Sequence, residues 1–448
     1  MQAPEQARQI AQSLVERGIA AGASAADAIY AGDHSSGVEV RLGEIEEVSR
    51  SESDGVGLRL FVGSRSATIA SSDLSDEALG VLVERCLAMA REAPEDCFAG
   101  LAPEDQLQRG PLPDIDSADT AEPDFAALRA RALEAEQAAL AVAGVTNSGG
   151  VSASASATVI GLATSGGFAG AYRSTGHGCS ASVIAGEAGA MQRDHDWHSA
   201  RHLADLDPAE AIGRRAGQRA VARLMPARVR PGTYPVLFDP RVSATLLGHF
   251  AGAIAGSAVA RKTSFLRDRL GDQLFAPGVA IIDDPLRPRG LRSRPFDAEG
   301  VRVARSELVG DGVLHSWIAD SASARQLGIR PTGHAARGIG GAPSAAPTNL
   351  YMAPGPRSRA ELLAAYPEAV LVIELIGHGI NTVTGDYSRG AAGFMVRNGE
   401  IAEPVAEITI ASNLNEMFAT LEPGSDLDFR RGTDAPTILV PQMVVASS

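Results

Sequence analysis

The residues whose types and spacing most resemble a catalytic or metal-binding motif lie in a glycine-rich helix expected over residues 239–259. His249 stands there among apolar side chains. In a metallopeptidase helix, a glutamate follows the first histidine and a second histidine lies about one turn further on. Here Phe250 follows His249, and Ile254 lies one turn on. Because one imidazole offers too few donors to hold zinc, the pattern favours a hydrogen-bonded structural histidine over a metal ligand.

The same segment has a helix start signal and three regularly spaced glycines. Asp239 can cap the free N–H groups, and Pro240 is tolerated at the first helical position. Gly248, Gly252 and Gly256 follow at intervals of four, which places them on one helix face. Each costs up to about 1 kcal/mol relative to alanine. We therefore expect another backbone to pack tightly on this face. The alternative is a break in the helix.

Two other groups of side chains could form sites. Three histidines are spaced three and four residues apart: His195, His198 and His202. On a helix they could bind a metal together, but their segment lacks a helical apolar stripe and is expected to be a strand or turn, where they do not converge. Ser388 could act as a nucleophile with His378 or His249. No Gly-x-Ser-x-Gly pattern surrounds Ser388, which argues against this role.

Charge and composition exclude several classes of protein. Lys and Arg number 40 against 54 Asp and Glu, a net charge of -14, which disfavours nucleic acid and anionic membranes as partners. The first residues have no basic segment followed by an apolar core, and no apolar run approaches the roughly 20 residues that span a bilayer. The three cysteines are scattered: Cys86, Cys97 and Cys179. Together these features predict a cytoplasmic protein without disulfides.

The elements that would position these residues fall into two parts. In the first part, helices are expected at 5–18, 72–87, 123–142 and 208–224, and strands at 26–31, 38–50, 57–70 and several times within 146–193. Residues 93–123 lack periodicity and are expected to form a long surface connection. Prolines and a glycine in 225–232 mark a boundary. We expect an α+β fold with an α/β amino-terminal domain (1–228) and a β-rich carboxy-terminal domain (229–448) that contains the 239–259 helix.

Several segments give the chain a resemblance to a known family. They are residues 246–266 (LLGHFAGAIAGSAVARKTSFL), 295–302 (PFDAEGVR), 323–328 (SARQLG), 332–334 (TGH) and 385–414 (GDYSRGAAGFMVRNGEIAEPVAEITIASNL). These segments resemble the TldD/PmbA peptidase family, in its PmbA/TldE branch. The amino half is similar in outline, including 40–62, so the resemblance spans nearly the whole chain.

The resemblance implies where the catalytic chemistry lies. In the TldD branch, a His-Glu-x-x-x-His helix and a cysteine near the carboxy end bind zinc. Here His249 matches the first histidine, Phe250 replaces the glutamate, and Ile254 replaces the second histidine. No cysteine follows Cys179. The resemblance therefore implies a chain that binds no metal or other cofactor and has no catalytic residues of its own, beside a TldD-like zinc peptidase partner that cleaves short or unfolded peptides.

Residues that could line a peptide cleft follow from this resemblance. Asp386, Tyr387, Ser388 and Arg389 lie in a glycine-bounded segment expected to be a turn. They could line the cleft, with Arg389 binding a carboxylate, or form a hairpin held by an Asp–Arg pair. Arg261 and Lys262 follow the glycine helix. They could satisfy its last carbonyl groups or contact a substrate or partner.

Three functions are consistent with the sequence. The first is the metal-free subunit of a TldD–TldE peptidase, which would bind peptides by adding them to exposed strand edges. It would serve in proteolysis, maturation of a peptide antibiotic and antitoxin turnover, as in the family. The second is a peptide-binding or chaperone-like module without enzymatic involvement. The third is a hydrolase with a non-metal site of its own. Co-purification with a His-Glu-x-x-x-His protein separates the first from the second.

Overall fold

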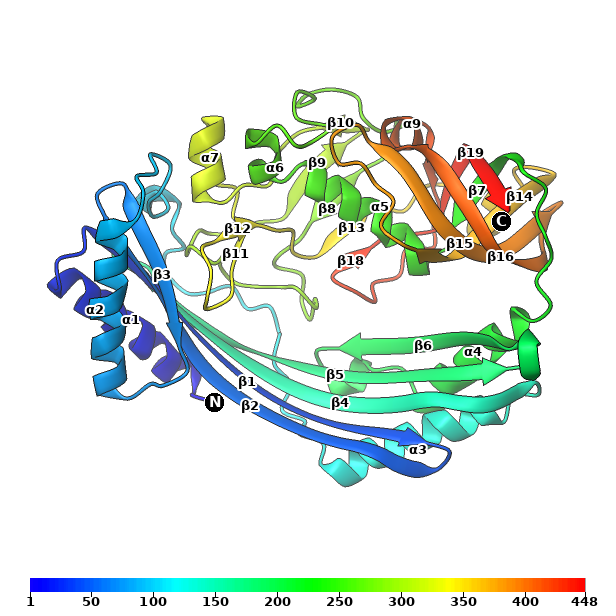
Figure 1. Ribbon diagram of the computed structural model, residues 1–448, viewed down its shortest axis with the longest axis horizontal. Helices are drawn as coiled ribbons and strands as arrows, with labels where there is room; N and C mark the ends of the chain where they lie inside the picture. Colours follow the sequence, from blue (N-terminus) through cyan, green and yellow to red (C-terminus); the bar gives the residue numbers. More distant parts are fainter. Residues whose placement is uncertain (448) are drawn as a thin grey trace.

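The amino-terminal half is organised around one long antiparallel sheet in the computed structural model, which describes residues 1–447 (Figure 1). Its strand order is β3-β2-β1-β4-β5-β6. The strands are β1 (Ala25–Arg41), β2 (Glu44–Val62), β3 (Arg65–Ser71), β4 (Val145–Thr164), β5 (Ala169–Ala185) and β6 (Gln192–Ala200). At roughly 3.3 Å per residue, such strands reach about 60 Å. The sheet therefore forms a platform along the whole molecule.

The predicted strands are correct in kind but wrong in extent. The expected strand 38–50 contains a hairpin turn at Leu42 and Gly43, both of which have positive φ. Residues 51–56, expected to connect two strands, lie inside β2. The first ten residues of β2 are exposed on both faces, so no apolar alternation marks them as a strand. The strands expected within 146–193 are confirmed as β4, β5 and the start of β6.

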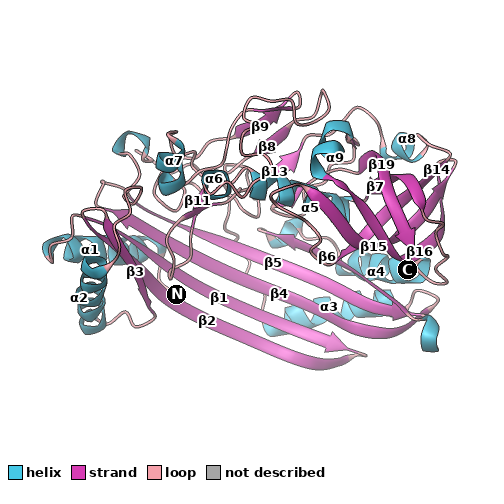
Figure 2. Ribbon diagram, turned by 45° about the horizontal axis from the view of Figure 1, so that its top comes forward, coloured by secondary structure: helices cyan, strands magenta, loops and turns pink. Residues whose placement is uncertain are grey.

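Four helices cover the ends of this sheet, and each was predicted. They are α1 (Pro4–Ala20), α2 (Asp76–Glu92), α3 (Phe125–Leu140) and α4 (Ala209–Ala222). Helices α1 and α2 pack at one end, and α3 and α4 at the other (Figure 2). Ser75 caps α2 and Asp124 caps α3 through their side chains. Each pair of helices has its own apolar core against the strands.

The long connection after α2 joins the two halves of the chain. It contains only a short 3-10 turn, η1 (Glu104–Gln106), as predicted, but it does not run over the surface throughout, because Ala102, Leu107 and Ile115 are buried. The backbone carbonyl of Phe98 accepts a hydrogen bond of 2.8 Å from the Arg325 side chain. Leu107 forms an isolated antiparallel β-bridge with Val301. Because its partners lie in the carboxy-terminal half, the connection fastens the two halves together.

The carboxy-terminal half is rich in strands. One sheet has the order β16-β15-β14-β7-β19-β17, and β16 also pairs with β19, so this sheet closes on itself. Its strands are β7 (Gly232–Phe238), β14 (Glu368–Ile376), β15 (Asp386–Arg397), β16 (Glu400–Asn413), β17 (Glu422–Pro423) and β19 (Ile438–Ser447). This confirms the α+β fold with a β-rich second part. The predicted boundary at 228/229 falls between α4 and β7.

Shorter elements complete this half. A second sheet, ordered β10-β9-β8-β13-β18, and a two-stranded sheet of β11 and β12 contain short strands. These are β8 (Ile281–Asp283), β9 (Ser306–Gly310), β10 (Val313–Leu314), β11 (Ala335–Ala336), β12 (Ser344–Ala345), β13 (Leu350–Met352) and β18 (Thr433–Asp434). The helices are α5 (Pro240–Ala253), α6 (Gly256–Ala260), α7 (Ser321–Leu327), α8 (Arg359–Leu363) and α9 (Leu414–Thr420). Within residues 1–447, no helix combines the length and apolar character needed to cross a bilayer.

Candidate functional site

Helix α5 begins where the sequence predicts. The Asp239 side chain accepts a hydrogen bond of 3.0 Å from the backbone N–H of Arg241, and Pro240 is the first helical residue. Asp239 also forms an ion pair of 2.7 Å with Arg359. The helix leaves β7 and buries one side in the largest apolar core of the chain. The start of α5 is therefore fixed both by its cap and by a contact to α8.

The expectation of one helix over 239–259 is wrong. Helix α5 ends at Ala253 and α6 begins at Gly256. Between them, the N–H of Gly256 donates to Ile318, and the N–H of Ile318 donates to Ile254. These bonds to a distant segment replace the helical ones, so the break is a tertiary effect.

The three glycines do not share one packing role. A Cβ added to Gly248 or Gly252 meets nothing within 4 Å, whereas one added to Gly256 lies 2.7 Å from the hydroxyl oxygen of Ser323. The expected close packing is therefore wrong for the first two. At Gly256, the atoms that lie close belong to the side chains of Ala319 and Ser323 and not to another backbone. Gly248 and Gly252 thus leave one face of α5 open.

Alanine at Gly248 or Gly252 should stabilise the isolated chain. Each change is expected to raise the free energy of unfolding by about 0.5–1 kcal/mol, because alanine loses less conformational freedom in a helix and fits here without a clash. Gly256→Ala is the matched control and should destabilise, because Ser323 must move. Urea unfolding monitored by circular dichroism measures all three. A loss of stability for Gly248→Ala or Gly252→Ala would contradict the open face.

The surroundings of His249 do not suit a zinc ion. Its Nε2 is buried and has no hydrogen-bond partner among residues 1–447, and its ring meets the Tyr387 ring edge-on at 6.2 Å. Phe250 is fully buried, with ring centres 5.4 Å from Phe275 and 6.3 Å from Phe418. Ile254 is fully buried as well. The positions that would carry a base and a second ligand are thus apolar. Within residues 1–447, no group of three or more His, Cys, Asp or Glu could hold a metal.

Burial of His249 makes stability depend on pH. Desolvation, helped by the charge of Arg389, lowers the pKa of His249 from 6.5 to about 4. The unfolded chain therefore binds a proton more readily than the folded chain below pH 6.5. Stability is complete above that value and falls as the pH drops toward 4, by about 1–3 kcal/mol for this partly exposed ring. His249→Gln should flatten this part of the curve in urea titrations from pH 8 to 4. Parallel curves for the two proteins would contradict the assignment.

The segment with Asp386 and Arg389 is a strand, so its expected turn is wrong. Both residues lie in β15 between β14 and β16. Asp386 binds Thr384 at 2.6 Å and Asn413 at 3.1 Å, and no Asp–Arg pair holds this part of the described chain. Tyr387 is buried, and no residue within 1–447 forms a hydrogen bond of normal geometry with its hydroxyl. Burial raises the pKa of Tyr387, and the nearby Arg389 charge opposes this. The cleft role of these residues stays a prediction.

The remaining predicted positions are scattered. The backbone N–H groups of Arg261 and Lys262 donate to carbonyls of α6, while their side chains are exposed. The backbone N–H of Ser388 donates to Gly379 at 2.7 Å, and among residues 1–447 its hydroxyl has no hydrogen bond to a histidine. Three histidines lie on β6 or just after it and have separate acidic neighbours, as expected for a strand: His195, His198 and His202. They do not form one site.

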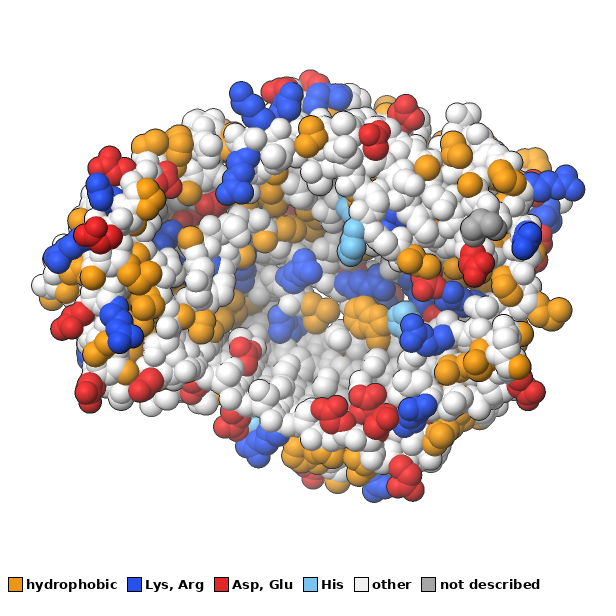
Figure 3. All heavy atoms as spheres, in the orientation of Figure 1, with side chains coloured by type: hydrophobic (Ala, Val, Ile, Leu, Met, Phe, Trp, Pro, Cys, Tyr) orange, Lys and Arg blue, Asp and Glu red, His pale blue; other side chains and the backbone are white. Residues whose placement is uncertain are grey.

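A deep hollow separates the long sheet from the carboxy-terminal half. Figure 3 shows it open to solvent, with Lys and Arg side chains gathered inside. In the same orientation, Figure 1 places α5 and β18 along its upper side. The open face of α5 borders a groove of about 470 Å³. We call this the α5 groove. It includes Gly248, Gly252, Arg292 and Arg431.

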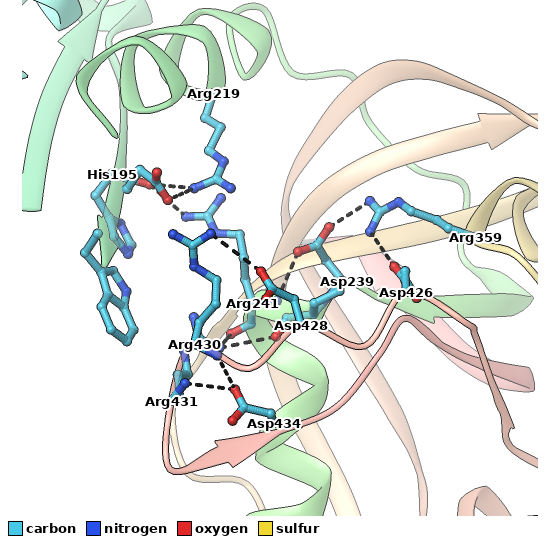
Figure 4. Close-up of a pocket in the computed structure, with 13 residues that line it drawn as sticks. His195, Arg219, Asp239, Arg241, Arg359, Asp426, Asp428, Arg430, Arg431 and Asp434 are labelled. Carbon is cyan, nitrogen blue, oxygen red and sulfur yellow. Dashed lines mark hydrogen bonds and ion pairs between the residues drawn. The ribbon is translucent and has the colours of Figure 1, made fainter. Parts of the chain in front are cut away.

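A second pocket, of about 260 Å³, lies where the two halves meet at the start of α5 (Figure 4). Five arginines and five aspartates line it. The buried carboxylate of Asp194 on β6 pairs with Arg241 at 2.5 Å. Burial raises the pKa of Asp434 to about 6, although two backbone N–H groups donate to it. Most of these charges are already paired with one another. The ion pairs in this pocket therefore help to hold the two halves of the chain together.

Sequence reasoning missed these arginines and aspartates. Arg292 and Arg431 lie in loops, and Asp194 lies beside the predicted histidine group. Isolated charges in loops carry no periodic signal, so only the fold shows that they converge.

Comparison with known proteins identifies the class. Family models of the PmbA/TldA metallopeptidases match domain 1 at residues 26–90, the central domain at 116–224 and the C-terminal domain at 231–447. The fold is therefore that of a metallopeptidase, although helix α5 lacks the residues for a metal. The chain belongs to the PmbA/TldD metalloprotease family.

Individual relatives agree. The chain is 38% identical to metalloprotease PmbA of Escherichia coli O157:H7 over 91% of its own length and 89% of that protein. It is 36% identical to a PmbA homolog of Haemophilus influenzae, over 99% and 97% of the two chains. A crystal structure of a putative modulator of DNA gyrase from Bacteroides thetaiotaomicron superposes with a TM-score of 0.90 at 25% identity, over 98% and 99% of the chains. TldE from Thermococcus kodakarensis shares the fold, with a TM-score of 0.87 at 20% identity, over 98% and 100%.

Proposed function

We propose that this chain is the metal-free, PmbA/TldE-like subunit of a heteromeric TldD–TldE-type peptidase that degrades or processes short or unfolded peptides in the cytoplasm. A TldD-like partner supplies the zinc and the general base. This chain supplies part of the peptide-binding surface. The observation that carries the proposal is the apolar burial of Phe250 and Ile254 beside a single imidazole at His249.

The chemistry of these side chains supports a division of labour. A catalytic zinc needs three protein ligands and a nearby base to activate water. A phenyl ring and a branched alkyl group provide neither, and both are held in the core by packing. The three cysteines that could act as soft ligands are free, and they all lie in the amino-terminal half. A metalloprotease fold with this composition fits a binding subunit better than a self-sufficient enzyme.

Reconstitution tests the proposal. The chain is purified alone, and again after co-expression with a His-Glu-x-x-x-His protein of the same family. We expect a stable complex that contains zinc and hydrolyses an unfolded peptide, while the chain alone contains no stoichiometric zinc and cleaves nothing. Cleavage by the chain alone that a chelator abolishes would refute the division of labour. Failure to form any complex would favour the peptide-binding or chaperone-like module.

A further inference from the structure

Two residues of α5 that line the α5 groove have no side chain. These are Gly248 and Gly252, and a Cβ at either position meets nothing within 4 Å. Ala345 and Pro347 line another part of the groove. The groove, at about 470 Å³, is large enough to hold several residues of an extended chain. A ligand backbone could therefore approach α5 closely at both glycines.

The charges of the groove have one sign. It is lined by three arginines and by no Asp or Glu. Arg241 is neutralised by Asp194. Arg292 and Arg431 form no ion pair within 4.0 Å with a carboxylate of residues 1–447. Arg431 donates to the carbonyls of Pro240 and Arg241, and the nearby charges of Asp434 and Asp239 act on it. In a chain of net charge -14, two such guanidinium groups at one groove point to an anionic ligand.

Arg292 is held at the groove by its neighbours. Its backbone N–H donates to the Asn349 side chain at 2.9 Å, and its Nη1 donates weakly to the Thr433 hydroxyl at 3.4 Å. The aliphatic part crosses Gly432, where an added Cβ would lie 2.3 Å from Cδ of Arg292. Gly432 thus leaves room for this side chain. Most donors of its guanidinium stay available to a ligand.

We propose that the α5 groove binds an extended peptide segment through a carboxylate held by Arg292 and Arg431, with the peptide backbone over Gly248 and Gly252. The carboxylate belongs to an acidic side chain or to the peptide's carboxy terminus. Guanidinium groups suit this partner because they can bind it in a two-pronged geometry. The inference rests on the proposed function, since it assigns part of the substrate binding of the complex to this chain.

Fluorescence anisotropy with the full-length chain tests the site. The probes are labelled ten-residue peptides: one rich in Glu with an amidated end, one with Gln in place of Glu and a free carboxy terminus, and one with Gln and an amidated end. We expect at least one carboxylate-bearing probe to bind about tenfold or more tightly than the last one, less so at high salt. Whichever probe binds identifies the source of the carboxylate.

Variants locate the binding. Arg292→Gln should weaken binding about tenfold or more, whereas Arg305→Gln removes the same charge from an exposed arginine outside the groove and should have no effect. Gly432→Ala keeps all charges but displaces Arg292, and should also weaken binding. Gly252→Leu should block the groove. Thermal melts confirm that each variant is folded.

Two results would overturn the inference: equal binding of all three probes, or equal affinities for Arg292→Gln and Arg305→Gln. Either result leaves the proposed function standing if the zinc complex still forms and cleaves peptides. Conversely, preference for a carboxylate by a chain that forms no complex would support the groove and refute the proposed function.

Discussion

Replacing Asp27 by alanine is expected to lower the free energy of unfolding by about 3–5 kcal/mol, because it leaves the buried Arg337 guanidinium without its counter-charge and Arg59 with only Glu299, 3.7 Å away. Asp27 lies on β1 with only 2% of its surface exposed. Its carboxylate pairs with Arg59 on β2 at 2.6 Å and with Arg337 of the carboxy-terminal half. Both arginine side chains are buried. The triad therefore holds the two halves together from the inside.

The effect of Asp27→Ala can be separated from a general loss of charge. Urea unfolding gives the free energy, and hydrogen exchange around residues 335–339 reports whether the halves separate first. Glu5→Ala is the control, since Glu5 forms an exposed pair with Arg8 and should leave the unfolding midpoint unchanged. A loss below about 1 kcal/mol for Asp27→Ala would mean that water already reaches the triad.

Restoring the metallopeptidase pattern with Phe250→Glu and Ile254→His is expected to unfold the chain and not to create a zinc site. Phe250 is enclosed by Phe275 and Phe418, so a glutamate there would lose the ring contacts and bury an unpaired acid. Loss of a buried phenyl group alone costs about 3–5 kcal/mol, and the buried polar group adds to this. Most of the stability of a typical domain would be lost.

Circular dichroism and elemental analysis measure the two parts of this prediction. Phe250→Leu keeps an apolar group and should cost less than about 1.5 kcal/mol. Phe125→Glu places the same acid on a partly exposed position of α3 and should be tolerated. A folded double variant that holds one zinc per chain would show that two substitutions are enough to restore metal binding, and would weaken the proposed function.

Local patterns predicted the helices better than the strands. Asp124 before a run of good helix formers is enough to place α3, because capping and helix propensity act within a few residues. Residues 51–53 of β2 are polar and exposed, so the predicted strand over 38–50 stopped before them. They lie in a strand because β1 pairs with β2 along its whole length.

The sequence by itself predicted the family, through segments such as 246–266 and 385–414, and showed that Phe250 and Ile254 stand where a glutamate and a second histidine would be. Only the tertiary structure decided where α5 breaks, which face of it stays open, and which arginines reach that face. It also brought Asp27 to Arg337, 310 positions away. The reason is physical: caps and periodicity involve neighbours along the chain, whereas a groove or a buried ion pair exists only once distant segments have packed together.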